Sequence, residues 1–219
     1  MNNELLSCLG AIEDPFLNES FGTNESFMIE PGTIPVMVSA PHSVSQRRQN
    51  TPKQGEFRSG TIVRMLRMLT QCHCIYKTRN DQDDANFDEE NPYRTKLVEY
   101  IKQNQISHLI DLHIMSPLRN HDIDLGTAHG VNIGGNYGLV ASIAQILAYN
   151  GISNVGVDRL FTAANPNTVS STVFRETQIF ALQIEMNWRL LDLPLGGESF
   201  LRVVESLERF IQFLQGEWV

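Results

Sequence analysis

Apolar runs alternate with amphipathic stretches along this 219-residue chain. Four short apolar runs predict buried strands, at residues 33–40, 74–78, 107–113 and 154–158. A fifth run, 178–187, also predicts a strand, although its pattern would fit a helix as well. Apolar residues recur at helical spacing in four further segments, 60–71, 92–103, 136–151 and 199–215. The last of these is expected to begin near Glu198 or Ser199.

The alternation of strands and helices predicts an α/β fold, with helices on both faces of a mixed, largely parallel central sheet. We expect a single three-layer α/β/α domain over residues 1–219, in which residues 1–30 are the least certain segment. In such folds ligands bind outside the carboxyl ends of the strands. Polar residues at those ends are therefore the first candidates for a functional site.

The charge of the chain limits its possible partners. The formal net charge is −8 and the pI is about 5.2, which argues against a nucleic-acid backbone as the main ligand. The basic cluster at residues 46–48 is expected to be solvated surface. No apolar run is long enough to span a membrane, and the N-terminus lacks the features of a secretory signal. We therefore expect a cytoplasmic protein without a membrane or nucleic-acid partner.

The three cysteines give a second line of evidence on compartment. An odd, small number of cysteines argues against a disulfide framework and fits a reducing environment. Two of them flank a histidine, as Cys72-His73-Cys74, which could suggest a metal site. In a strand, alternate residues share a face, so His73 would point away from both cysteines. Buried cysteines are therefore the favoured interpretation.

Candidate chemistry gathers at the ends of the predicted strands. His42 follows the first strand, and Asp111 and His113 close the third. Two histidines, a carboxylate and an open position form a typical catalytic Zn²⁺ site. Glu185 lies inside an apolar run, where a carboxylate is costly unless it is paired or used, so it suits the role of general base. Arg175 and Arg189 are alternative ion-pair partners for Glu185.

Four segments, in order, resemble the N-formylglutamate amidohydrolase family: PVMVSAPHS, DANFDEENPYR, LIDLHIMSP and LQIEMNWRLLD. The family belongs to a zinc-carboxypeptidase-like group that includes aspartoacylase and succinylglutamate desuccinylase. The resemblance covers roughly residues 33–192 and implies a phosphorylase/hydrolase-like fold. It implies that His42 and His113 are metal ligands and that Glu185 is the general base. Arg189 resembles the arginine that follows this base.

The DANF segment, with Asp84 and Asn86, resembles a substrate-binding Asp-x-Asn-Arg segment of related enzymes. Here Phe87 stands in place of the arginine, so Arg79 or Arg94 becomes the candidate partner of a substrate carboxylate. His121 and His129 are further candidates for contact with substrate or with a developing oxyanion.

A second departure concerns the metal ligands. The group's first ligand pair is His-x-x-Glu, but Ser45 stands where that glutamate would follow His42. We expect Glu56 to supply the missing carboxylate, provided that the loop after His42 folds back. Gln46 is a poorer choice, since a neutral amide binds Zn²⁺ weakly.

Taken together, the sequence predicts a Zn²⁺-dependent hydrolase that cleaves the amide bond of a small acidic N-acyl amino acid or a short peptide. Mn²⁺, Fe²⁺ or Co²⁺ would accept the same ligands. The alternative is a non-catalytic α/β protein that keeps the fold and the metal and binds a small ligand. The missing His-x-x-Glu and Phe87 favour this alternative, whereas Glu185 counts against it.

Overall fold

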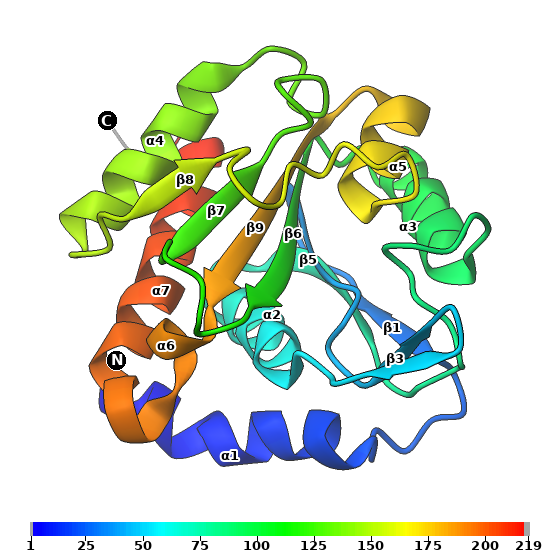
Figure 1. Cartoon of the computed structure of the whole chain (residues 1–219), viewed down its shortest axis with the longest axis horizontal. Helices are drawn as coiled ribbons and strands as arrows, with labels where there is room; N and C mark the ends of the chain where they lie inside the picture. The colour runs from blue at the N-terminus through cyan, green and yellow to red at the C-terminus, as the bar shows by residue number, and fades with distance from the viewer. Residues whose placement is uncertain (1, 217–219) are drawn as a thin grey trace.

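The computed structural model describes the backbone of residues 2–216, and the side chains of this range except those of 2–6 and 194–196. Its centre is a seven-stranded sheet, which Figure 1 shows as arrows. Its strands run in the spatial order β1 (Phe27–Glu30), β5 (Cys72–Lys77), β2 (Ile34–Ala40), β6 (His108–Met115), β9 (Phe180–Asn187), β7 (Ile123–Gly126) and β8 (Val155–Val157). Neighbours are parallel except at β1–β5 and β7–β9. The sheet is therefore mixed and mostly parallel, as predicted.

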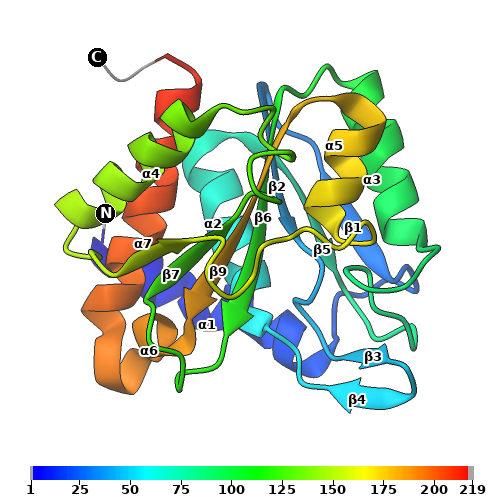
Figure 2. The same ribbon diagram turned by 45° about the horizontal axis from the view of Figure 1, so that its top comes forward.

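Helices cover both faces of this sheet (Figures 1 and 2). One face packs against α1 (Asn2–Asn18), α2 (Phe57–Thr70), α4 (Tyr137–Tyr149) and α7 (Leu193–Leu214). The other face packs against α3 (Pro92–Gln103) and α5 (Val169–Thr177). The predicted three-layer α/β/α arrangement is confirmed. Among the described residues, no helix combines the length and the apolar character needed to cross a membrane.

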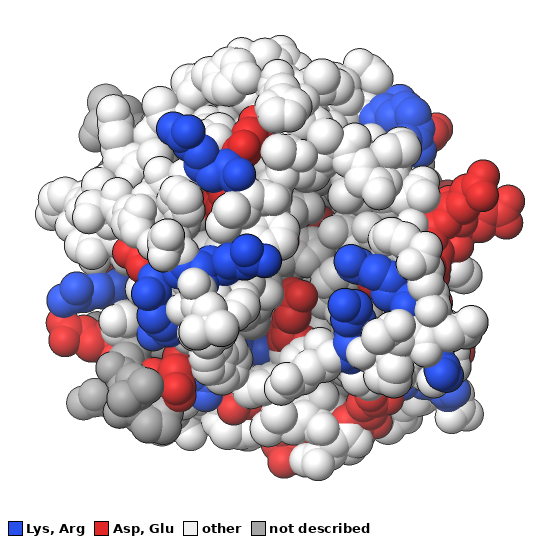
Figure 3. Space-filling view, viewed as in Figure 1, with Lys and Arg blue, Asp and Glu red and all other residues white. Residues whose placement is uncertain are grey.

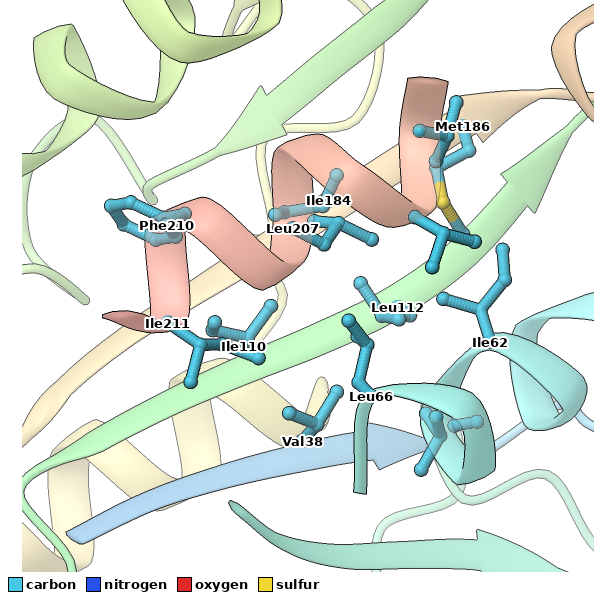
Figure 4. Packing of buried hydrophobic residues seen from close by; sticks show 14 of the residues in the cluster. Val38, Ile62, Leu66, Ile110, Leu112, Ile184, Met186, Leu207, Phe210 and Ile211 are labelled. Atoms are coloured by element: carbon cyan, nitrogen blue, oxygen red, sulfur yellow. The ribbon is translucent and has the colours of Figure 1, made fainter. Parts of the chain in front are cut away.

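The larger core lies between the sheet and the α2–α7 layer. Figure 4 shows side chains of this core, among them Leu66 of α2, Phe210 of α7, Val38 of β2, Ile110 of β6 and Ile184 of β9. Strand side chains alternate between faces. The positions between these core residues on β6 and β9 therefore face the α3–α5 side, and there the sequence places polar residues.

Local signals explain most helix boundaries. Asn91 caps α3 by accepting a hydrogen bond from the backbone N–H of Tyr93, and Pro92 occupies the first helical position. Asn136 caps α4 in the same manner. The closing helix begins at Leu193 after Asp192, so the expected start near Glu198 or Ser199 is wrong.

Several elements were not predicted from the sequence. They are β1, β7, α1, α5, the short helix α6 (Trp188–Leu191) and a hairpin of β3 (Gln46–Arg48) and β4 (Thr51–Lys53). The strands are only three or four residues long, which is too short to show a period. Helix α1 buries Leu9, Ile12 and Phe16 in the core, although Pro15 lies within it.

The chain reverses direction across the sheet between β2 and β6. From β2 it passes through α2 to β5 on one side, and from β5 through α3 to β6 on the other side of β2. A site forms readily at such a switch point, because the loops that leave the two strands diverge. His42 and His113 lie at this point.

Candidate metal centre

The loop after β2 brings two predicted ligands together. His42 lies two residues beyond the end of β2, and the β3–β4 hairpin then carries the chain outward and back. On its return, the backbone N–H of Glu56 donates to the carbonyl oxygen of His42 at 2.7 Å. The expected fold-back is therefore present, and Glu56 lies immediately before α2.

The side chains of His42, Glu56 and His113 converge on one point. Glu56 Oε1 lies 3.1 Å from His42 Nδ1, which lies 3.2 Å from His113 Nδ1. His113 Nδ1 lies 3.6 Å from Glu56 Oε2, and the three ligand atoms lie within 4.8 Å of one another. Tetrahedral Zn²⁺ ligands at about 2.0–2.1 Å from the ion are separated by about 3.3 Å. The donor set and its spacing therefore fit a divalent metal ion.

A carboxylate holds the far nitrogen of each histidine ring. His42 Nε2 lies 2.9 Å from Asp84 Oδ1, and His113 Nε2 lies 3.1 Å from Asp111 Oδ2. Both aspartates are fully buried. A carboxylate can only accept, so each Nε2 donates and each Nδ1 presents its lone pair to the point of convergence in the neutral ring. Such outer carboxylates are a regular feature of metal-bound histidines.

The two Nδ1 atoms lie 3.2 Å apart, and their lone pairs would repel each other. A cation that lies between the two nitrogens, or that is bound to one of them, removes this repulsion. In the metal-free protein a proton on one of the two rings would supply this charge. Burial opposes the charged ring of His42, but the charge of Glu56 and the hydrogen bonds that the ring donates to Asp84 and Glu56 raise its pKa to about 9. The pKa of His113 is also raised despite burial, through Asp111 and Glu56. Burial opposes the charged form of Glu56, but the charges and hydrogen bonds of His42 and His113 together lower its pKa to about 2.

Glu185 lies beside this cluster on the neighbouring strand. In the register of β6 and β9 it is the direct partner of His113. Burial raises its pKa to about 7, and Gln183 Nε2 donates to its Oε1 at 3.1 Å. Its alternative partners are engaged elsewhere: Arg175 pairs with Glu176, and Arg189 with Asp122. The geometry therefore leaves Glu185 facing the candidate metal centre.

A cleft of about 490 Å³ opens over the cluster and is lined by His42, Glu56, His113 and Glu185. Arg48 and Lys53 of the hairpin line the same cleft. The space-filling view shows acidic side chains in a recess on this face, with Lys and Arg side chains on both sides of it (Figure 3). The cleft thus combines an acidic interior with a basic rim.

Arg48 is integrated into the site. Its Nε donates to Asp84 Oδ2 at 2.7 Å, and its guanidinium carbon lies 4.8 Å from the ring centroid of Phe87. The sequence-based expectation that this basic cluster is merely solvated surface is wrong for Arg48. A cation from the hairpin covers Phe87, which stands where the sequence resemblance would place an arginine.

Of the other predicted substrate contacts, one lines the cleft and the rest do not. Asn86 lines the cleft, with its Oδ1 accepting from the backbone N–H of Val169, while Asp84 stands behind His42. The remaining five candidates are not among the residues that line the cleft. Arg79 donates to Asn24, Arg94 to backbone carbonyls of the loop before α3, and Arg189 to Asp122. His129 lies near Asp158, and His121 lies beside Gly156.

Sequence reasoning missed three contributors to the cleft, namely Arg48, Lys53 and Gln183, and gave no role to Asp111. The spacing could have identified two of these four. Asp111-Leu112-His113 and Gln183-Ile184-Glu185 are i, i+2 pairs on strands, so each pair shares a face. The arginine and the lysine carry no such signal, because the hairpin that positions them is too short to predict.

No protein-family model matches the sequence, and no curated protein sequence does either. Solved structures do share the fold. A bacteriophage poly-gamma-glutamate hydrolase aligns at 15% identity with a TM-score of 0.57, over 89% of this chain and 92% of that one. N-formylglutamate amidohydrolase from Ralstonia eutropha JMP134 aligns at 15% identity with a TM-score of 0.57, over 88% of this chain and 99% of that one.

A metallo-carboxypeptidase from Pseudomonas aeruginosa, in complex with (2-guanidinoethylmercapto)succinic acid, aligns at 14% identity with a TM-score of 0.54. The alignment covers 87% of this chain and 60% of that one. At these identities the similarity concerns the fold. The resemblance noted from sequence segments, to the N-formylglutamate amidohydrolases and the wider carboxypeptidase-like group, is thereby confirmed at the level of architecture.

Proposed function

We propose that this protein is a metal-dependent hydrolase that cleaves an amide bond in a small N-acyl amino acid or short peptide. The observation that carries the proposal is the convergence of His42, Glu56 and His113 at metal-ligand spacing. Glu185, a buried carboxylate, lies next to them in an open cleft. A purely structural cluster would not require such a cleft.

Two imidazoles and a carboxylate suit Zn²⁺ first, and Mn²⁺, Fe²⁺ or Co²⁺ as well. When bound, the ion would lower the pKa of water to about 7 and polarise a carbonyl group. His42, Glu56 and His113 would hold it, and Asp84 and Asp111 would fix the two imidazole rings.

Glu185 is the proton carrier in this proposal. It takes a proton from the attacking water and delivers it to the leaving nitrogen as the carbon–nitrogen bond breaks, so the carboxylate is regenerated. Burial raises its pKa to about 7, close to neutral pH, where a group can both accept and return a proton. No other glutamate lines the cleft besides Glu56, among the residues that the structure describes.

An acidic substrate fits the basic rim. Arg48 and Lys53 line the cleft of a protein with a net charge of −8, and they provide local attraction for a carboxylate. The names of two structural neighbours refer to glutamate derivatives, in keeping with such a substrate. These two cations replace Arg79, Arg94 and Arg189 as the proposed substrate contacts.

The rival proposal, a non-catalytic ligand-binding protein, rested on two missing residues. In our proposal Glu56 supplies the carboxylate that the absent near-neighbour glutamate would give, and Arg48 covers Phe87.

The cysteines Cys8, Cys72 and Cys74 are free, which fits our placement of the protein in a reducing compartment such as the cytoplasm.

The test is an amine-release assay of the zinc-loaded protein on a panel of N-formyl and N-acyl amino acids. Glu185→Gln should keep the metal and lose about 10²–10⁴-fold in kcat, since it removes the proton carrier alone. Glu176→Gln, an exposed glutamate paired with Arg175, is the matched control and should keep full activity. Bound metal without turnover on the whole panel would refute the hydrolase, and an active Glu185→Gln would remove this residue from the mechanism.

A further inference from the structure

Two neighbouring strands carry matched pairs of polar residues at the site. On β6, Asp111 bonds to His113 at 3.1 Å, and on β9, Gln183 bonds to Glu185 at 3.1 Å. The parallel register places Asp111 opposite Gln183 and His113 opposite Glu185. In each strand, the residue farther from the carboxyl end of the strand forms a hydrogen bond with the residue nearer to that end. The pairs differ in one respect: Gln183 lines the cleft, and Asp111 is not among its lining residues.

The amide of Gln183 is only half used within the protein. In the ionised state of Glu185, the state that takes up a proton in the proposed reaction, Nε2 donates to the carboxylate, and this fixes the orientation of the amide, because a carboxylate accepts and does not donate. Its Oε1 is buried and finds no hydrogen-bond partner among the described residues. Gln183 is 3% exposed. Asp111 Oδ1 also lacks a partner there, but two acceptors cannot satisfy each other.

A buried, unpaired carbonyl oxygen is costly, so its presence calls for an explanation. Oε1 belongs to a side chain that lines the cleft, next to the proposed proton carrier. A molecule bound in the cleft can supply the missing donor. The group it must offer is an N–H or an O–H.

We propose that Gln183 Oε1 accepts a hydrogen bond from the N–H of the scissile amide, while Nε2 keeps Glu185 in place. This proposal rests on the proposed amide hydrolysis and adds a specificity for it. One side chain contacts both the leaving nitrogen and the carboxylate that returns a proton to it. Gln183 forms and breaks no covalent bond. The site consequently selects secondary amides over esters and over amides whose nitrogen carries no hydrogen.

Gln46 provides a matched control within the same cleft. It is 6% exposed, lines the cleft and has a buried Oε1 without a partner among the described residues. It belongs to the hairpin, and among the described residues the hydrogen bond to the Glu185 side chain comes from Gln183 and not from Gln46. Methionine is similar in size to glutamine, so replacing either glutamine by methionine removes the amide group and keeps the side-chain volume.

The experiment gives the zinc-loaded protein two substrates, an N-acyl amino acid and the matching ester. The two share the acyl group and the carboxylic acid, and they differ only in the N–H of the amide, which is an oxygen in the ester. The quantity measured is the ratio of kcat/KM for the amide to that for the ester. Because intrinsic reactivity cancels when ratios are compared between variants, the change in ratio reports on the N–H contact. In Gln183→Met the ratio should fall about tenfold, and in Gln46→Met it should stay unchanged. Zinc content and thermal unfolding verify that each variant is folded.

Equal losses for amide and ester in Gln183→Met would overturn the proposal, since they indicate that Gln183 only supports Glu185. A changed ratio in Gln46→Met with none in Gln183→Met would overturn it as well. If Gln183→Met does not fold, Gln183→Asn, one methylene shorter, should show the same fall in ratio.

A failure of the proposed function gives a different result. If the wild type cleaves neither compound, hydrolysis is refuted, and calorimetric binding of the same pair to the zinc-loaded protein tests Gln183 alone. An amide that binds about tenfold more tightly than the ester in the wild type, but not in Gln183→Met, would support the contact. Equal affinities in the wild type would overturn it.

Discussion

Two regions of this protein place histidines next to potential metal ligands, and only one of them forms a converging set of donors. On β5, His73 lies between Cys72 and Cys74. Its Nδ1 accepts from the backbone N–H of Gly32 at 3.0 Å and lies 2.8 Å from the hydroxyl of Tyr100. The two cysteines belong to the core on the other face of the sheet, and burial raises the pKa of Cys72 to about 11.

At the switch point, by contrast, His42 and His113 come from different strands and meet Glu56. Their outer nitrogens bond to Asp84 and Asp111, so both inner nitrogens are available. Adjacent ligand types in sequence are therefore a weaker signal than histidines that end neighbouring strands. What distinguishes a metal centre is the direction of the side chains and the partner of the second ring nitrogen.

The largest expected effect comes from removing a ligand. His113→Ala and Glu56→Ala should each weaken zinc binding about 10²–10³-fold, because ~10–16 kcal/mol of zinc affinity shared among three protein ligands and a water gives ~2.5–4 kcal/mol for each. His73→Ala is the matched control and should leave the zinc affinity unchanged, whatever its effect on stability. Competition with a chromophoric chelator measures all three. Weaker zinc binding in His73→Ala than in the other two variants would reverse the comparison.

The next effect concerns the carboxylates behind the histidines. Asp111→Asn should lower zinc affinity about 10–100-fold, since the imidazole of His113 loses a charged acceptor. The side chain at position 111 keeps its shape in this variant. Asp122→Asn, whose aspartate pairs with Arg189 away from the cleft, should have no effect. The same chelator competition applies. An unchanged affinity in Asp111→Asn would mean that this aspartate serves the fold alone.

A smaller effect is expected at the rim of the cleft. Arg48→Gln should raise KM for an acidic substrate about tenfold, through the loss of a cation that lines the cleft. Arg47 lies next to it on the same hairpin but bonds to Gln82 and does not line the cleft, so Arg47→Gln is the control. Steady-state kinetics on an acidic and a neutral substrate separate the two. Equal KM changes for both substrates would argue against a charge contact.

The smallest expected effect is that zinc changes the pH dependence of thermal stability. The pKa of His42 in the metal-free fold is about 9, compared with 6.5 when unperturbed, so its contribution to stability is complete below pH 6.5 and is lost as pH rises through 9. Glu185, raised from 4.5 to about 7, acts in the same direction at lower pH. The Tm of the metal-free protein should therefore fall between pH 6.5 and 9.

Zinc should oppose this fall, because the metal binds deprotonated histidines and its affinity rises with pH. The difference in Tm between zinc-loaded and metal-free protein should then grow over the same range. Calorimetric unfolding with and without chelator provides the measurement. A difference in Tm that is constant with pH would contradict the assignment of His42 as a ligand.

Sequence and structure agree where a physical signal spans many residues. The long apolar runs predicted the central strands, and the order of strand and helix predicted the layers. His42, His113 and Glu185 were recognisable because each ends or interrupts such a run. Glu56 was inferred from a missing neighbour, and its position depends on a hairpin of two three-residue strands. Arg48 and Lys53 depend on that same hairpin, which has no periodicity, so no pattern in the sequence could place them at the cleft.

The most direct test of the central claim is the X-ray absorption spectrum of the protein loaded with one equivalent of zinc. The account predicts a ligand shell of nitrogen and oxygen at about 2.0–2.1 Å, with imidazole scattering from two histidines and no sulfur. A sulfur shell at about 2.3 Å would place the metal at Cys72 and Cys74 and contradict the assignment. Failure to retain one zinc ion per chain would contradict it as well.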